Sequence, residues 1–181
     1  DDAVLIDGAS RRNLELTQNI RGGDDHTLFS VLNKTATNMG ARLLQRWLNR
    51  PIRSRAVLNE RFDSIEYVLE QHLHAKFAAH FKQIGDIERI LARVALRSAR
   101  PRDLARLRDA LRVLPTLALD LTPIVIPRLR ELATLCQPLP ALANTLACAI
   151  IDNPAMVIRE GGVIATGFDA ELDELRAISE N

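Results

Sequence analysis

The most regular feature of this sequence lies between Gly85 and Leu114, where apolar residues recur every three or four positions. This spacing places them along one side of an α-helix. Two stripes are expected, the first formed by Ile87, Ile90, Leu91 and Val94 and the second by Leu104, Leu107, Leu111 and Leu114. Pro101 stands where a first-turn proline belongs, so it marks the start of the second helix. Two helices joined by so few residues must be antiparallel neighbours or meet at a corner.

Helix packing is also what the composition favours for the rest of the chain. Aromatic residues make up only 4% of the 181 residues, so leucine, isoleucine, valine and alanine must fill the interior. A β-sandwich would be richer in aromatic and β-branched residues. We therefore predict a mainly α fold, a multi-helix domain with a few short β-strands or one hairpin. The length suits one domain or two small helical lobes.

Capping residues and prolines predict where the other helices begin and end. Thr27, Thr37, Ser54 and Asp169 each precede an apolar run and can cap a helix there. Further helices are expected over 128–135 and 139–151, and a kink or break over 72–74, where the periodicity falters. Pro115, Pro123, Pro127, Pro138 and Pro140 are expected to divide the chain into short segments. Trp47 lies on the apolar stripe of the helix that Thr37 starts, and we expect it in the core.

Extended structure is expected at three places. Val4–Asp7 is short and apolar, and Leu14–Thr17 alternates as a half-buried strand does. Residues 157–168 contain two apolar runs around Gly161-Gly162, which predicts a β-hairpin. The expected order is an entry segment over 1–26, a helical core over 27–156, the hairpin over 157–168 and the start of a long helix over 169–181. All four are assigned to one domain.

The charges are unevenly spread, although the net charge of +1 carries no overall signature of nucleic-acid binding. Residues 85–112 are rich in arginine, and the candidate contact residues there are Arg89, Arg93, Arg97, Arg100, Arg102 and Arg106. Three interpretations stay open: contact with DNA phosphates, contact with another domain, and ion pairs within the chain. The third rests on carboxylates three residues before an arginine, namely Asp86 with Arg89, Asp103 with Arg106 and Asp109 with Arg112.

The sequence predicts no catalytic, cofactor-binding or metal-binding residue. The phosphate-binding pattern GxxxxGK[ST] does not occur, and Gly161-Gly162 is followed by valine and isoleucine instead of lysine. His72 and His74 are two apart, so on a helix they point to opposite sides and do not share a metal ion. Cys136 and Cys148 have no metal-binding spacing, and we interpret them as reduced core residues.

Four blocks, in order over almost the whole chain, carry a resemblance to a known family: Asp7–Leu16, Thr27–Leu48, Gly85–Leu104 and Gly161–Arg176. Together they resemble the core, or lever, region of bacterial DNA mismatch repair proteins of the MutS family. One departure is Asn38, where relatives often carry proline. The cap at Thr37 does not need that proline, so the departure puts little in doubt.

The resemblance implies a structural and allosteric role in a DNA mismatch-recognition ATPase, in which this region couples the nucleotide state to DNA clamping. It implies that ATP and Mg²⁺ bind in another domain of the full-length protein, with no cofactor and no catalysis in this region. The implied partners are the connector, clamp and ATPase domains, a second MutS subunit, mismatched duplex DNA and a repair factor of the MutL type. The implied place is the bacterial cytoplasm, on the nucleoid, with no membrane. The alternative is an autonomous helical nucleic-acid-binding module that uses the arginines of 85–112.

Overall fold

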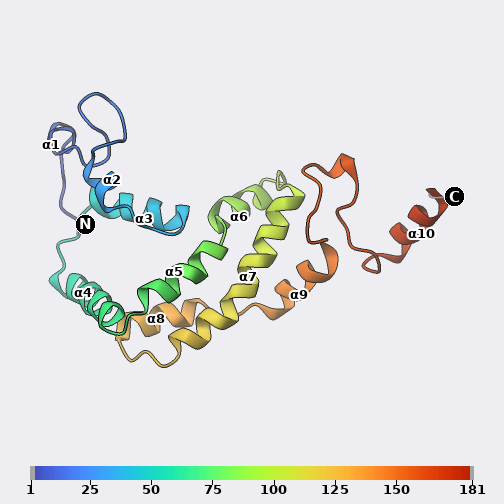
Figure 1. Ribbon diagram of the computed structural model, residues 1–181. Helices are drawn as coiled ribbons and strands as arrows, with labels where there is room; N and C mark the ends of the chain where they lie inside the picture. Colours follow the sequence, from blue (N-terminus) through green and yellow to red (C-terminus); the bar gives the residue numbers. More distant parts are fainter. Residues whose placement is uncertain (1–2, 180–181) are drawn as a thin grey trace. The chain divides into compact units, whose positions relative to one another are not determined.

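The computed structural model describes residues 3–179, and α-helices dominate it (Figure 1). Their bounds are Gly8–Asn13 (α1), Leu28–Leu32 (α2), Asn38–Asn49 (α3), Arg55–Glu70 (α4), His74–Gln83 (α5), Ile87–Ala95 (α6), Pro101–Leu121 (α7), Pro127–Leu135 (α8), Pro140–Ala149 (α9) and Ala170–Ser179 (α10). Strand pairing within 3–179 is limited to two isolated antiparallel bridges, Ala3 with Ile52 and Ile150 with Ile164. The prediction of a mainly α fold is confirmed.

The helices group into two compact units. The first unit contains α1 to α5 and α8, and the second contains α6, α7 as far as Asp120, α9 and α10. The chain passes from the first unit to the second after Lys82, returns to the first for 121–134 and ends in the second.

The predicted helix starts are confirmed by the side chains that cap them. Thr27 and Ser30 form a reciprocal capping box, in which each side-chain oxygen accepts the backbone N–H of the other residue. Thr37, Ser54 and Asp169 accept the N–H groups of Gly40, Val57 and Leu172 respectively. Each of these bonds satisfies a donor that the first helical turn leaves without a partner.

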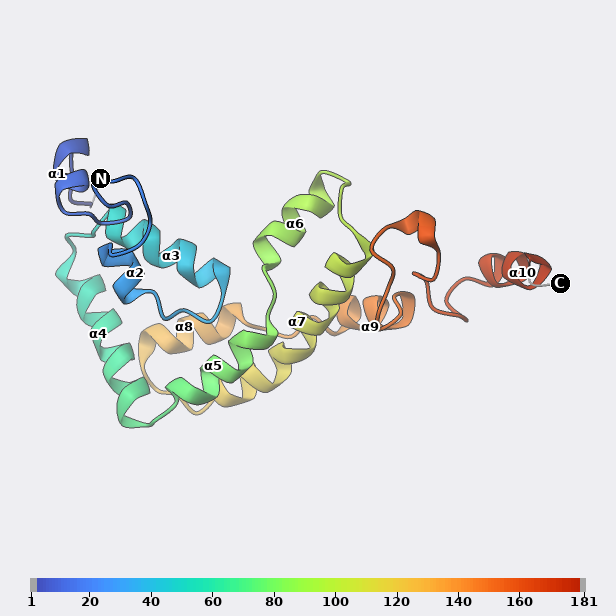
Figure 2. The same cartoon turned by 45° about the horizontal axis from the view of Figure 1, so that its top comes forward.

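The second unit has a contiguous apolar core between α6, α7 and α9. α6 lies beside the first half of α7, as Figure 2 shows. The buried members of this core are Ile90, Ala105, Leu107, Leu111, Leu146, Ala149 and Ile150. The stripe predicted for α7 is confirmed, since Leu107 and Leu111 are buried and Leu104 and Leu114 pack against them. On α6 only Ile90 is fully buried, whereas Leu91 and Val94 are exposed.

The first unit leaves much of its apolar surface open. Phe62, Ile65 and Leu69 share a face of α4, and all three are exposed. The expectation that Trp47 lies in the core was wrong, because this side chain on α3 is 41% exposed. The guanidinium of Arg61 lies over its ring, 3.8 Å from the ring centroid. The neighbouring segments therefore cover only part of the apolar stripe of α3.

The expected strand at Leu14–Thr17 is absent, and a short helix precedes it. The Asp7 carboxylate accepts the N–H groups of Ala9 and Ser10, both at 2.9 Å, and so starts α1. The chain then turns at Glu15, whose φ is +45°. The expected edge strand at Val4–Asp7 also fails to form, because pairing there is limited to the isolated bridge of Ala3 with Ile52 and the bond from the N–H of Val4 to the carbonyl of Pro51.

The predicted hairpin over 157–168 is wrong as well. Ile158–Glu160 forms one turn of 3-10 helix, and the chain then reverses through Gly161 and Gly162, whose φ angles are +72° and +59°. Both angles lie in the left-handed region that glycine adopts without strain. The second apolar run pairs through Ile164 with Ile150, outside the predicted hairpin. Ile164 therefore pairs with Ile150, which lies outside 157–168, and not with the apolar run before Gly161.

Most of the predicted breaks form, since Pro123 and Pro138 lie between helices and Pro127 and Pro140 each begin one. α4 ends at Glu70 and α5 begins at His74, with His72 at a φ of +52° between them, so the break over 72–74 is confirmed. Pro115, by contrast, lies inside α7. A proline inside a helix costs about 3 kcal/mol. Pro115 is on the exposed side, and continuing the helix buries Leu117 and Leu121, which offsets that cost.

Candidate functional site

The six candidate arginines all lie in the second unit, on α6, on α7 and on the connection between them. Arg89 and Arg93 belong to α6, Arg97 and Arg100 to the connection, and Arg102 and Arg106 to α7. Five of them are exposed and Arg93 is half-buried. The structure brings them into one region, but carboxylates and carbonyls lie among them.

One ion pair in this region joins the two helices. Arg93 donates two hydrogen bonds to Asp103, from Nε to Oδ2 at 2.8 Å and from Nη2 to Oδ1 at 2.6 Å. Oδ2 also accepts the N–H of Arg100 at 3.0 Å. Burial raises the pKa of the Asp103 carboxyl, but the bonds from Arg93 and Arg100 outweigh that effect and hold the pKa below its usual range. Asp103 was expected to pair with Arg106, and its observed partner is Arg93.

The connection between α6 and α7 has a fixed geometry. Arg97 adopts a left-handed φ of +53° and donates its N–H to the carbonyl of Val94. The N–H of Ser98 reaches back to the carbonyl of Arg93 at 2.8 Å. These two bonds form a Schellman motif, which usually has glycine where Arg97 stands. The usual glycine signal for the end of α6 is therefore missing, and the corner was predicted only from Pro101 and the short connection.

Sequence reasoning missed a buried arginine, Arg108 on α7. Its side chain is almost fully buried, at 2% exposure, yet it carries a charge. Nη1 donates to the carbonyls of Ile150 and Ile151 at 2.9 and 3.1 Å, and Nη2 approaches that of Asp152 at 3.5 Å. Carboxylates of two aspartates complete the site, with Asp109 3.0 Å from Nε and Asp152 3.3 Å from Nη1.

A signal for this burial was present in the sequence. Arg108 follows Leu104 by four residues and precedes Leu111 by three, so it lies within the apolar stripe of α7. A charged residue on the core face of a helix is buried only when it is paired and hydrogen-bonded. The partners, however, come from 150–152, more than forty residues further along the chain, and no local pattern indicates them.

The other arginines are partly engaged within the unit. Arg89 pairs with Asp86 at 3.5 Å and Arg112 with Asp109 at 3.6 Å, as predicted. Arg102 donates from Nε to the carbonyl of Pro154 at 3.2 Å. Two surface depressions in this region mix both signs of charge: one of about 370 Å³ contains Arg102, Arg106, Asp109 and Asp152, and one of about 470 Å³ contains Arg93, Arg100 and Asp103. Neither offers the uniform positive potential that phosphates favour.

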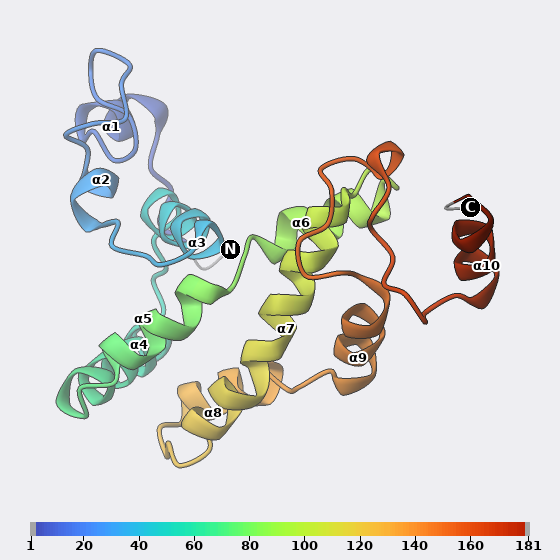
Figure 3. The ribbon, with the colours of Figure 1, turned by 45° about the vertical axis from the view of Figure 1, so that its right-hand side comes forward.

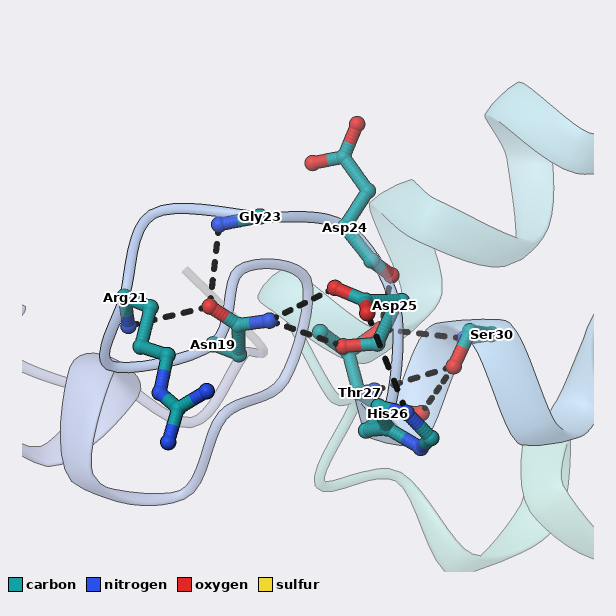
Figure 4. A network of polar contacts seen from close by, with 8 residues as sticks. All are labelled: Asn19, Arg21, Gly23, Asp24, Asp25, His26, Thr27 and Ser30. Atoms are coloured by element: carbon teal, nitrogen blue, oxygen red, sulfur yellow. Dashed lines mark hydrogen bonds and ion pairs between the residues drawn. The ribbon is translucent and has the colours of Figure 1, made fainter.

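A second polar network lies in the first unit, in the loop before α2 (Figure 4). The side chain of Asn19 accepts the N–H groups of Arg21 and Gly23 through Oδ1. Its Nδ2 donates to the backbone carbonyl and the carboxylate of Asp25. All of these bonds stay within the loop and fix its shape, so the network is structural.

Within residues 3–179, no group of three or more His, Cys, Asp or Glu side chains is placed to hold a metal ion. No helix in the described chain is long and apolar enough to cross a membrane. Both cysteines are free, and the expectation that both lie in the core was wrong for Cys148, which is exposed. Cys136 is half-buried, and burial raises the pKa of its thiol.

The second unit is a helical scaffold in which Arg93 links α6 to α7 and Arg108 links α7 to the backbone after α9. Comparison with known protein families identifies the chain, since residues 9–180 match the family model of MutS domain III. The match spans nearly the whole sequence, so this chain belongs to the MutS family of mismatch repair proteins. Domain III is the core, or lever, region of these proteins and is a non-catalytic domain.

Proposed function

We propose that this chain is the lever of a DNA mismatch-recognition ATPase, which transmits the nucleotide state of an ATPase domain to the domains that clamp DNA. The family supports a role in mismatch repair. The observation that carries the mechanical part is the bidentate pair of Arg93 with Asp103, which fixes α6 against α7. Helices joined by short directional bonds move as one body, and rigid-body movement is a common way to link distant sites.

The proposal places the chemistry outside this chain. ATP and Mg²⁺ bind in the ATPase domain of the full-length protein, and DNA contacts belong to other domains. The lever then has contacts with the connector, clamp and ATPase domains, within a dimer that meets mismatched duplex DNA and a repair factor of the MutL type. Such a protein works in the bacterial cytoplasm, on the nucleoid.

The test measures coupling in the full-length protein. Affinity for mismatched DNA is determined with and without ATP, and the ratio of the two affinities is the coupling. Arg93→Met is expected to reduce this ratio by about threefold or more, since allosteric couplings typically span about 5-fold to 150-fold. Arg89→Met removes an exposed arginine one turn earlier on the same helix and is expected to leave the ratio unchanged. Equal ratios in Arg93→Met and the parent, or ATP hydrolysis by this chain alone, contradict the proposal.

The alternative is a nucleic-acid-binding module that uses the arginines of 85–112. It finds support in Arg97 and Arg106, whose side chains make no ion pair or hydrogen bond with the described residues. It predicts DNA affinity that falls steeply with salt and is lost when Arg89, Arg93 and Arg97 are replaced by glutamate. The ion pairs of Arg89 and Arg93 weaken this alternative, because they already neutralise part of the charge.

A further inference from the structure

The segment between α9 and α10 is held by arginines at both of its ends. Figure 3 shows it passing beside α7, whose Arg102 and Arg108 bind its backbone, before it reaches α10. We propose that Arg108 and Arg176 are positioning residues that set the direction of α10 relative to α7, through the backbone that lies between them. The inference rests on the proposed lever function and names the residues through which a movement of α7 would reach α10.

The first link joins α7 to the backbone just after α9. Arg108 binds the carbonyls of Ile150 and Ile151 and approaches that of Asp152, next to the C-terminus of α9. A positive charge is favourable at this end of a helix, because the carbonyl dipoles point toward it. A buried guanidinium that loses these acceptors would leave a charge without partners, so the link resists displacement.

The second link joins this backbone to the strand-like residues before α10. The N–H of Ile151 donates to the carbonyl of Val163 at 3.1 Å, and the N–H of Ala165 donates to that of Ala149 at 2.9 Å. These bonds flank the bridge between Ile150 and Ile164. Val163 and Ile164 also pack against the apolar core of the unit.

The third link reaches α10. Arg176 donates from Nη2 to the carbonyl of Ile164 at 2.9 Å and from Nη1 to Asp173 at 3.2 Å. The second carboxylate oxygen of Asp173 accepts the N–H of Gly167 at 2.6 Å. The turn before α10 is thus fixed to the helix itself, and a continuous series of bonds runs from α7 to α10.

Arginine is the side chain that this arrangement requires at both ends. Its planar guanidinium carries five donors and no acceptor, so one side chain can bind several carbonyl or carboxylate oxygens in a fixed geometry. Lysine presents a single ammonium on a flexible stem and does not reproduce that geometry. Replacing arginine with lysine at 108 or 176 therefore keeps the charge and removes the positioning.

The experiment compares four variants of the full-length protein: Arg108→Lys, Arg176→Met and two matched controls. The controls are Arg106→Met, an exposed arginine on α7, and Arg159→Met, an exposed arginine in the segment itself. Hydrogen–deuterium exchange reports the amides of Ile151 and Ala165, and the ratio of DNA affinities with and without ATP reports coupling. Arg176→Met removes a side chain that is only partly buried, so the test survives if the Arg108 variant fails to fold.

We expect Arg108→Lys and Arg176→Met to speed exchange at these two amides by about tenfold or more and to reduce the coupling ratio, while both controls match the parent. Unchanged exchange in Arg176→Met overturns the inference. Faster exchange with an unchanged coupling ratio also overturns it and leaves the lever function standing. A parent protein whose DNA affinity does not respond to ATP refutes the lever function, and the inference falls with it.

Discussion

In the second unit, the apolar side chains of α6, α7 and α9 meet in one core, whereas in the first unit the apolar face of α4 stays open to solvent. Ile90 in the second unit is 1% exposed and Phe62 in the first is 61% exposed, although both occupy an apolar stripe with helical spacing. The same pattern therefore has two outcomes. Periodicity determines which face of a helix is apolar, and the neighbouring elements determine whether that face is covered.

Two arginine contacts, one from each unit, show the same difference, although Asp7 in the first unit also accepts directional backbone bonds. The second unit holds Arg108 and Asp103 inside directional bonds to the backbone and to other side chains. In the first unit, Arg61 lies over the ring of Trp47, a contact that tolerates several geometries. The links from α7 to α6 and to 150–152 thus have a fixed geometry, which the proposed lever function requires, and four measurements test that contrast.

The largest effect on the free energy of unfolding is expected from truncating an apolar side chain in the second unit. The same kind of truncation in the first unit serves as the comparison. Ile90→Ala is expected to lower the free energy of unfolding by about 3 kcal/mol, because it removes a fully buried side chain and leaves a cavity. Phe62→Ala removes an exposed side chain, and its effect is expected to stay within about 0.5 kcal/mol. Urea denaturation of the two variants measures both values. Equal losses would show that the face of α4 is as well covered as the core of the second unit.

The next largest effect on the free energy of unfolding is expected at Arg108, and Arg112 on the same helix serves as the comparison. Arg108→Met is expected to lower the free energy of unfolding by about 3 kcal/mol, since the buried carbonyl of Ile150 and the partly buried carbonyl of Ile151 lose their donor. Arg112→Met, at an exposed ion pair, is expected to change it by less than about 0.5 kcal/mol. Thermal or urea denaturation provides the measurement. A small effect at Arg108 would mean that water replaces the guanidinium at little cost.

The third effect depends on pH and concerns the corner between α6 and α7. The folded state depresses the pKa of Asp103, so its ionised form adds stability above the pKa of about 4 that an unfolded aspartate has. That stability is lost as the pH falls through the lower, folded-state pKa. Asp103→Asn is expected to lower the stability by about 2 kcal/mol at neutral pH, in the range of hydrogen bonds to charged groups, and to flatten the acid dependence. An unchanged acid profile in this variant would assign the dependence to other carboxylates.

The smallest effect concerns the contact in the first unit. Arg61→Met is expected to cost about 0.5 kcal/mol, the size of a cation–π contact at an exposed site. The chain has a single tryptophan, so its fluorescence reports on this contact directly. Removing the guanidinium is expected to alter the emission of Trp47 and to leave the helical content unchanged. Arg55→Met, earlier on the same helix, serves as the control.

Much of the fold followed from the sequence, because helices depend on groups a few residues apart. Thr27, Thr37 and Ser54 cap the N–H groups of their own first turn, and the stripe of α7 follows from its 3.6-residue period. The short strands and the hairpin were not predicted correctly, because pairing of extended segments depends on partners elsewhere in the fold.

What only the tertiary structure decided was which groups meet. Asp103 has Arg106 as its neighbour three residues on, yet Arg93 on another helix binds it. Arg108 is buried because carbonyls from 150–152 arrive beside it, and Ile164 pairs with Ile150 because α9 ends there. Local spacing specifies an element through bonds that form within it. The choice among partners far apart in sequence depends on the packing of the whole unit, since a charge or a backbone group is buried only where that packing supplies its partner.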